Sequence, residues 1–299
     1  MRRRWLGWGL LVAGGLAALF WGLTIPERLP ETDIATAPGD PARGARLFWV
    51  GGCASCHAAK GAKGPEQLRL GGGAPLVTAF GSFVPPNISP DPVHGIGGWS
   101  LADFANAMQR GVDPEGRHLY PAFPYTSYAR MAEGDIADLY AYLRTLPPVA
   151  APSAPSEIGF PFNIRRGIGL WKWAFFDPSP VAVLPMGGTR ERRIGQYLVE
   201  GPGHCGECHT PRTYRGAGGL DRTQWLKGAP AAEGSGKVPG LTPAQLKWSA
   251  EEIAEYLKTG FTPDYDSVGG SMAEVQSNLA KLDDADRAAI AAYLKALPK

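Results

Sequence analysis

Two five-residue stretches constrain this chain of 299 residues more than any other feature. They are Cys53-Ala54-Ser55-Cys56-His57 and Cys205-Gly206-Glu207-Cys208-His209, and together they contain all four cysteines of the chain. In the spacing C-x-x-C-H the two thiols lie about one helical turn apart, so they can add to the two vinyl groups of one porphyrin. The adjoining His57 or His209 then reaches the iron. The pattern predicts two covalently attached haem c groups.

Three other uses of such motifs fit less well. A four-cysteine zinc ribbon pairs two C-x-x-C knuckles about 15 to 20 residues apart, whereas Cys56 and Cys205 are far more widely separated. A redox dithiol or a disulfide has no use for a histidine at the fifth place. We therefore predict Cys53, Cys56, Cys205 and Cys208 as the haem-binding thiols, and His57 and His209 as iron ligands.

Charge and composition exclude other classes of protein. The formal net charge is +2, and it disappears when Arg2, Arg3 and Arg4 are set aside, so no basic surplus points to nucleic acid. Gly and Pro are abundant at 40 and 28 residues, yet 44% of the residues are apolar and nine are Trp. This mixture favours a loop-rich fold around a large apolar cofactor over a disordered chain.

Residues 1–25 are predicted to form a transmembrane anchor. Three arginines precede about 21 uncharged residues, from Trp5 to Ile25, which is enough helix to span the hydrocarbon core. The arginines should stay in the cytoplasm, which places the haem domains in the periplasm, at the bacterial inner membrane. A cleaved signal peptide is the alternative, but no A-x-A-like site follows Phe20. The polar, Pro-rich residues 26–40 are expected to act as a spacer.

The rest of the chain contains an internal repeat. Trp99-Ser100 recurs as Trp248-Ser249, and Gly111 recurs as Gly260, at an offset of 149 residues. Ser100 with Asp103, and Ser249 with Glu252, are typical of capping boxes that begin a helix of about ten residues. Near the ends of the two copies, Ala141-Tyr142-Leu143 recurs as Ala292-Tyr293-Leu294 at an offset of 151 residues. Both end segments carry an apolar stripe of helical spacing: Ile136, Leu139, Tyr140 and Leu143; Ile290, Tyr293, Leu294 and Leu297. Neither half shows the alternation of a strand.

Each half thus reads as helix, C-x-x-C-H motif, loop, short helix, second loop and terminal helix. This order resembles class I cytochrome c domains, over about residues 41–149 and 189–299. Residues 86–91, 95–100 and 116–121 are similar to segments of the di-haem and tri-haem cytochrome subunits of membrane-bound quinoprotein alcohol dehydrogenases. The predicted fold is mainly α, with two tandem cytochrome c domains behind a transmembrane helix.

Residues 150–188 join the two halves. A Pro/Ala/Ser connector opens this stretch, and residues 160–176 are too aromatic and basic for a free linker. We interpret residues 150–188 as an interdomain strap, with residues 160–176 packed into the groove between the domains. The alternative is a surface that touches lipid headgroups or a partner.

The resemblance also implies a methionine on the second face of each iron. Met272 follows small residues and precedes the terminal helix by about ten residues, so it is the predicted sixth ligand of haem 2. The repeat carries Met272 onto Pro121, Ala122 and Phe123, none of which can ligate iron. Met131 is the candidate for haem 1, although it maps onto Leu282 and core packing is its default. His118 and Tyr120 remain alternatives; His94 and His204 have no assigned role.

The resemblance implies electron transfer from a periplasmic dehydrogenase to quinone, a soluble cytochrome or a terminal oxidase. A large dehydrogenase subunit is the candidate partner. An electron-transfer subunit needs no catalytic site of its own. The alternative is an enzyme of the thiosulfate dehydrogenase or peroxidase type that acts at an open haem 1, and a weaker one is a gas sensor.

Overall fold

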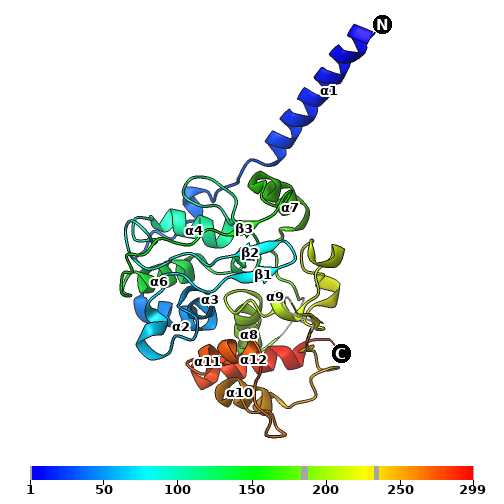
Figure 1. The fold of residues 1–299 in the computed structure, drawn as a ribbon. Helices are drawn as coiled ribbons and strands as arrows, with labels where there is room; N and C mark the ends of the chain where they lie inside the picture. Colours follow the sequence, from blue (N-terminus) through cyan, green and yellow to red (C-terminus); the bar gives the residue numbers. More distant parts are fainter. Residues whose placement is uncertain (1, 183–187, 232–235, 299) are drawn as a thin grey trace.

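The structure is a computed structural model that describes residues 2–182, 188–231 and 236–298. Two helical domains lie against each other, and a single helix, α1 (Arg2–Leu23), projects from the first of them (Figure 1). Met1, Lys299 and residues 183–187 of the predicted strap lie outside the described residues, as do the side chains of Arg2, Arg3 and Arg4.

The first domain is built from five α-helices and two short 3-10 helices around one core. Their bounds are η1 (Glu31–Asp33), α2 (Pro41–Val50), α3 (Cys53–His57), η2 (Gly64–Leu68), α4 (Leu101–Arg110), α5 (Tyr125–Tyr128) and α6 (Glu133–Leu143). Helices α2 and α6 cross, and the apolar stripe of α6 points into the core, where Ile136, Leu139 and Leu143 are buried.

The second domain repeats this plan. Its helices are α8 (Arg190–Glu200), α9 (Gly206–His209), η4 (Tyr214–Gly216), η5 (Arg222–Gln224), α10 (Ala250–Thr259), α11 (Met272–Leu279) and α12 (Asp284–Ala296). Helices α8 and α12 cross as α2 and α6 do, and the predicted stripe of α12 is buried in the second core. The helix-rich, tandem architecture expected from the repeat is confirmed.

Glycine allows both helix crossings to be close. A Cβ built on Gly44 of α2 would lie 2.0 Å from the carbonyl oxygen of Asp138 in α6. A Cβ built on Gly195 of α8 would lie 1.9 Å from the carbonyl oxygen of Ala289 in α12. In each domain, therefore, the backbones of the first and last helix touch at this glycine, and any side chain there would hold the two helices apart. Gly44 and Gly195 are 151 residues apart in the sequence, so the two contacts are equivalent.

The two predicted capping boxes are present. The Ser100 hydroxyl accepts a hydrogen bond from the backbone N–H of Asp103, and the Asp103 carboxylate accepts one from the backbone N–H of Ser100. Ser249 and Glu252 do the same at the start of α10. Each helix then ends at a glycine with positive φ, Gly111 or Gly260, as the sequence predicts.

Two small sheets were not anticipated. Strands β1 (Leu76–Thr78), β2 (Gly81–Phe83) and β3 (Glu157–Ile158) form one antiparallel sheet, and β4 (Ala229–Pro230) pairs with β5 (Lys237–Val238). Strands of two or three residues are too short to show alternation. Strand β3 belongs to the interdomain segment, so it attaches the start of that segment to the first domain.

The segment between the domains is folded onto both of them. It contains η3 (Arg165–Gly167) and α7 (Ile168–Phe175), which lies beside the base of α1 (Figure 1). Lys172 donates hydrogen bonds of 2.5 and 2.7 Å to the last carbonyls of α4, and Trp171 donates one to Ala217 of the second domain. Several apolar side chains stay exposed all the same: Phe160, Phe162, Ile164, Leu170 and Trp173.

The base of α1 is fixed to the first domain. Thr24 is fully buried, its carbonyl oxygen is 3.0 Å from His118 Nε2, and Arg166 stacks on Trp21. Farther along, Leu29 donates its backbone N–H to Asn106. The spacer predicted for residues 26–40 is therefore packed in part against the domain. Within the described residues, no helix combines the length and the apolar character that crossing a membrane requires. The predicted anchor stays a prediction.

Candidate functional site

Both C-x-x-C-H motifs form single turns of helix directly after the first helix of their domain. Gly52, in the left-handed region at φ 60°, begins α3, and Cys205 precedes α9. In each motif the first cysteine is half-buried and the second, Cys56 or Cys208, is exposed. The four thiols are free, so no disulfide forms among them.

The two motif histidines are held in the same way. Nδ1 of His57 lies 2.7 Å from the carbonyl oxygen of Pro86, and Nδ1 of His209 lies 2.7 Å from that of Pro239. A carbonyl only accepts, so Nδ1 carries the hydrogen and Nε2 keeps its lone pair for a metal. Burial lowers the pKa of both imidazoles, although the carbonyl bond opposes it, and so favours the neutral ring that a metal needs.

These donors fit haem c. Burial raises the pKa of Cys53 and of Cys205 to about 12, so both are thiols at neutral pH, and a thiol supplies the sulfur and the hydrogen that add across a vinyl group. Among the described residues, no three His, Cys, Asp or Glu side chains gather into a metal-binding cluster. A zinc site made from these cysteines is therefore not supported, whereas one histidine beside two thiols is the donor set that haem c uses.

Met272 is the first residue of α11 and is half-buried against the second core. Gly270, two residues before it, has a positive φ of 60° and no atom within 4 Å of a built Cβ, so the turn before Met272 is open. The structure thus presents Met272 at the start of a helix on the edge of the core. Its role as the sixth ligand of haem 2 stays a prediction.

Met131 lies in a different setting. Its side chain is only 4% exposed and belongs to the first core, as Leu282, 151 residues later, belongs to the second. Its backbone carbonyl accepts a hydrogen bond from Gln109. The default expected from the repeat, core packing, is the arrangement seen, and ligation of haem 1 by Met131 stays a prediction.

The other candidates for haem 1 have partners of their own. His118 Nε2 is 3.0 Å from the carbonyl oxygen of Thr24, at the base of α1, and its Nδ1 is buried without a partner. The hydroxyl of Tyr120 donates to the carbonyl oxygen of Phe162. Phe123 packs against the first core. The contacts of His118 and Tyr120 lead to the base of α1 and to the interdomain segment, whereas the core that Phe123 joins also contains Ala54 of the first motif.

The two domains meet through equivalent surfaces. Arg46 of α2 pairs with Asp286 of α12 at 2.5 and 2.8 Å, and the hydroxyl of Tyr197 of α8 donates to Asp135 of α6. Arg46 and Tyr197 are 151 residues apart in the sequence, and so are Asp135 and Asp286. Each contact is therefore the repeat of the other, and the interface has a pseudo-two-fold axis like that of a symmetric dimer.

The C-x-x-C-H motifs lie close to this axis. His204, directly before the second motif, places Nε2 3.1 Å from the carbonyl oxygen of Gly51, two residues before the first motif. The pKa of Cys56 is raised by burial and, to a smaller extent, by the charges of Glu274 and Cys208. The two motifs thus lie within electrostatic reach of each other.

His204 is the residue that sequence reasoning missed. Its ring packs edge-on against Tyr128 of the first domain, with centroids 5.6 Å apart, and its φ is positive at 38°. A positive φ is uncommon for a residue other than glycine, so the contacts of His204 with Gly51 and Tyr128 hold it in this conformation. The available signal was its place next to Cys205.

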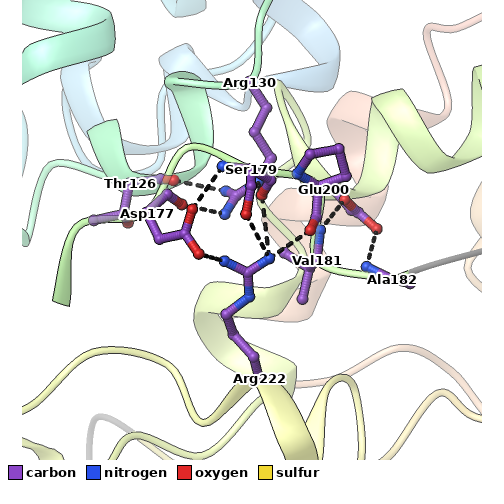
Figure 2. A network of polar contacts seen from close by, with 9 residues as sticks. Thr126, Arg130, Asp177, Ser179, Val181, Ala182, Glu200 and Arg222 are labelled. Carbon is purple, nitrogen blue, oxygen red and sulfur yellow. Dashed lines mark hydrogen bonds and ion pairs between the residues drawn. The ribbon is translucent and has the colours of Figure 1, made fainter.

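Arginines from both domains hold the interdomain segment (Figure 2). Arg130 of the first domain donates to the carbonyl oxygens of Asp177 and Ser179, and Arg222 of the second pairs with the Asp177 carboxylate. Glu200 accepts from the backbone N–H groups of Val181 and Ala182. The interdomain segment is therefore bonded to side chains of both domains and connects them as a strap.

Comparison with known proteins identifies the fold. The cytochrome c family model matches residues 41–147 and 194–298, which is most of the chain. The chain belongs to the cytochrome c family. It is 52% identical to the "Diheme cytochrome c-type" protein of Cereibacter sphaeroides over 98% of this chain and 97% of that protein. This cytochrome carries two covalently bound haem c groups.

Other relatives are parts of dehydrogenases. The fructose dehydrogenase cytochrome subunit of Gluconobacter japonicus is 34% identical over 90% of this chain. The cytochrome c subunit of the quinone-dependent alcohol dehydrogenase of Gluconobacter oxydans is 33% identical over 98% of it. The cytochrome spans only 57% and 60% of these two longer proteins. The resemblance expected from the motifs is confirmed.

The methionine predictions are tested by two matched substitutions. Met272→Leu keeps the bulk but removes the thioether, so we expect the near-infrared sulfur-to-iron band of haem 2 to disappear and its potential to fall, because a thioether favours ferrous iron. Met131→Leu should change the spectrum only if its sulfur leaves the core for iron. In a purely core role it should alter stability by less than about 1.5 kcal/mol. An unchanged band in Met272→Leu would exclude that residue.

Proposed function

We propose that this cytochrome is an electron-transfer subunit that takes electrons from a periplasmic dehydrogenase and passes them to quinone, a soluble cytochrome or a terminal oxidase. Each bound haem supplies an iron that cycles between ferric and ferrous states. The observation that carries the proposal is the placement of two equivalent attachment sites on either side of one interdomain axis.

The protein's own residues serve this function by forming a rigid surrounding for the two sites. His57 and His209 are fixed by backbone carbonyls, the segments directly before the two motifs are joined through Gly51 and His204, and the interdomain segment bonds to both domains. A rigid surrounding keeps the reorganisation that accompanies a change of charge small. No proton-transferring side chain is required for such a carrier.

A dehydrogenase is the proposed source of electrons because several relatives are named as dehydrogenase cytochrome subunits. Quinone, soluble cytochrome and oxidase remain the candidate acceptors. The partner would approach one haem domain while the other faces the acceptor, an arrangement for which two sites in one rigid body are suited.

We further propose that the N-terminal helix attaches the cytochrome to the bacterial inner membrane, with the haem domains in the periplasm. Support comes from the apolar side chains of α1, among them Trp8, Leu11 and Leu16, which are exposed. Trp173 and Phe160 of the strap are also exposed, and aromatic side chains favour the membrane interface. Because Arg166 stacks on Trp21, α1 and the strap are held together.

Both parts of the proposal can be tested on the full chain. It should sediment with phospholipid vesicles even at high salt, because apolar insertion is not screened by ions. On the vesicles, a reductive titration should show two one-electron steps per chain, and reduced protein should not bind carbon monoxide. Rapid, stoichiometric binding of carbon monoxide to one haem would instead favour an enzyme or a gas sensor at an open site.

A further inference from the structure

The second variable residue of each C-x-x-C-H motif reaches across the interdomain interface. Ser55 Oγ accepts a 2.6 Å hydrogen bond from Asn278 Nδ2 of the second domain. Glu207 Oε1 accepts bonds of 2.7 and 2.9 Å from the hydroxyls of Thr126 and Ser127 of the first domain. Ser127 and Asn278 are 151 residues apart in the sequence, so the two contacts are equivalent about the pseudo-two-fold axis.

The partners of these bonds lie on the segments that precede the terminal helices. Asn278 belongs to α11, a single helix of eight residues whose first residue is Met272. Ser127 belongs to α5, which lies between Phe123 and Met131. These segments are where the sixth ligands are predicted, so each motif is bonded to the ligand segment of the other domain.

Both contacts are partly buried, and each has one partner that is almost completely buried. The side chain of Asn278 is 2% exposed, and its Oδ1 is buried without a hydrogen-bond partner, so the bond to Ser55 is the polar contact that orients the amide. Ser127 is 1% exposed. A partly buried hydrogen bond transmits a displacement more directly than a fully solvated one, because water does not reach the enclosed partner.

We infer that Ser55 and Glu207 are positioning residues that couple the two haem sites, because each bonds the motif of one haem to the ligand segment of the other. The inference rests on the proposed electron-transfer function. A change of charge at one site then alters the orientation of α11 or α5, and with it the potential of the other site. The two reduction steps of the protein are therefore linked.

The test uses neutral substitutions in the full, haem-loaded chain, so that no formal charge is added or removed. Ser55→Ala deletes one cross-domain bond and Ser127→Ala weakens the other, while Ser277→Ala is the matched control on an exposed position of α11. Two haems per chain and an unchanged circular dichroism spectrum show that each variant is folded. Both reduction potentials are then read from one spectroelectrochemical titration.

Coupling predicts that Ser55→Ala and Ser127→Ala each move both reduction steps, one of them by about fivefold in its equilibrium constant, or about 40 mV at 59 mV per tenfold. Ser277→Ala should move neither step. If each variant moves one step alone, or none, the inference is overturned, because a contact that serves only its own motif affects one haem. If the wild type lacks two reduction steps, the proposed function fails instead, and the coupling with it.

Discussion

A chain with Cys53→Ser and Cys56→Ser should keep one covalent haem instead of two. Serine hydroxyls do not add to vinyl groups, so the first motif loses both thioether bonds while His57 remains. The second motif, with Cys205 and Cys208, is separate and should still be loaded. After denaturation and extraction with acidic acetone, the haem remaining per chain should fall by half, with a c-type pyridine spectrum.

The reciprocal variant is the control. Cys205→Ser with Cys208→Ser should also leave one haem, and the two variants should differ in potential, because the predicted sixth ligands, Met131 and Met272, lie in different surroundings, one buried in a core and one at the edge of a core. Loss of all colour into the solvent from the unmodified chain would contradict covalent attachment. So would two retained haems in either variant.

Removing one haem should also loosen the interface. The residues just before the two motifs touch through Gly51 and His204, and Cys56 and Cys208 lie within electrostatic reach of each other. A large apolar cofactor beside this contact adds buried apolar surface to its own domain, and the interface is built on that domain. We therefore expect each single-haem variant to unfold at lower urea concentration than the parent.

The sequence predicts much of this site because covalent haem attachment has a fixed spacing. Two thiols and a histidine need no knowledge of tertiary structure to be recognised, and the capping boxes at Ser100 and Ser249 are equally local. The buried stripes of α6 and α12 follow from periodicity. The capping boxes and the buried residues of the two stripes were found where they were predicted.

The interdomain contacts could not be predicted in the same way. The pairs Arg46 with Asp286 and Ser55 with Asn278 join residues more than two hundred positions apart. Nothing local in the sequence distinguishes Ser55 from any exposed serine. Only the docking of the two domains gives it a partner, and docking depends on the shapes of whole surfaces.

The short strands and the packed spacer were missed for a related reason. Strand β3 exists because the interdomain segment passes along β2, and the backbone of Leu29 is fixed by the side chain of Asn106. Both depend on tertiary contacts that override weak local preference. The sixth ligands remain predictions for the same reason. The repeat predicts a core position for Met131, and the sequence does not show whether the thioether of a methionine is directed at the iron.

Gly195→Ala should destabilise the second domain by about 3 kcal/mol or more. The added Cβ would meet the carbonyl oxygen of Ala289 at 1.9 Å, and a backbone atom cannot rotate away as a side chain can. Helices α8 and α12 would have to separate, which disturbs the packing around Tyr293 and its bond from Trp225. Unfolding in urea, followed by circular dichroism and by the haem Soret band, measures the loss.

Gly134→Ala in the first turn of α6 is the matched control. No atom lies within 4 Å of its built Cβ, so alanine should be neutral or stabilise the helix by up to about 1 kcal/mol. Gly44→Ala should behave like Gly195→Ala in the first domain, because the two crossings are equivalent. If Gly195→Ala were as stable as Gly134→Ala, the backbone contact between the crossing helices would not exist in solution. The close crossing of first and last helix, on which the placement of each haem motif depends, would then need another explanation.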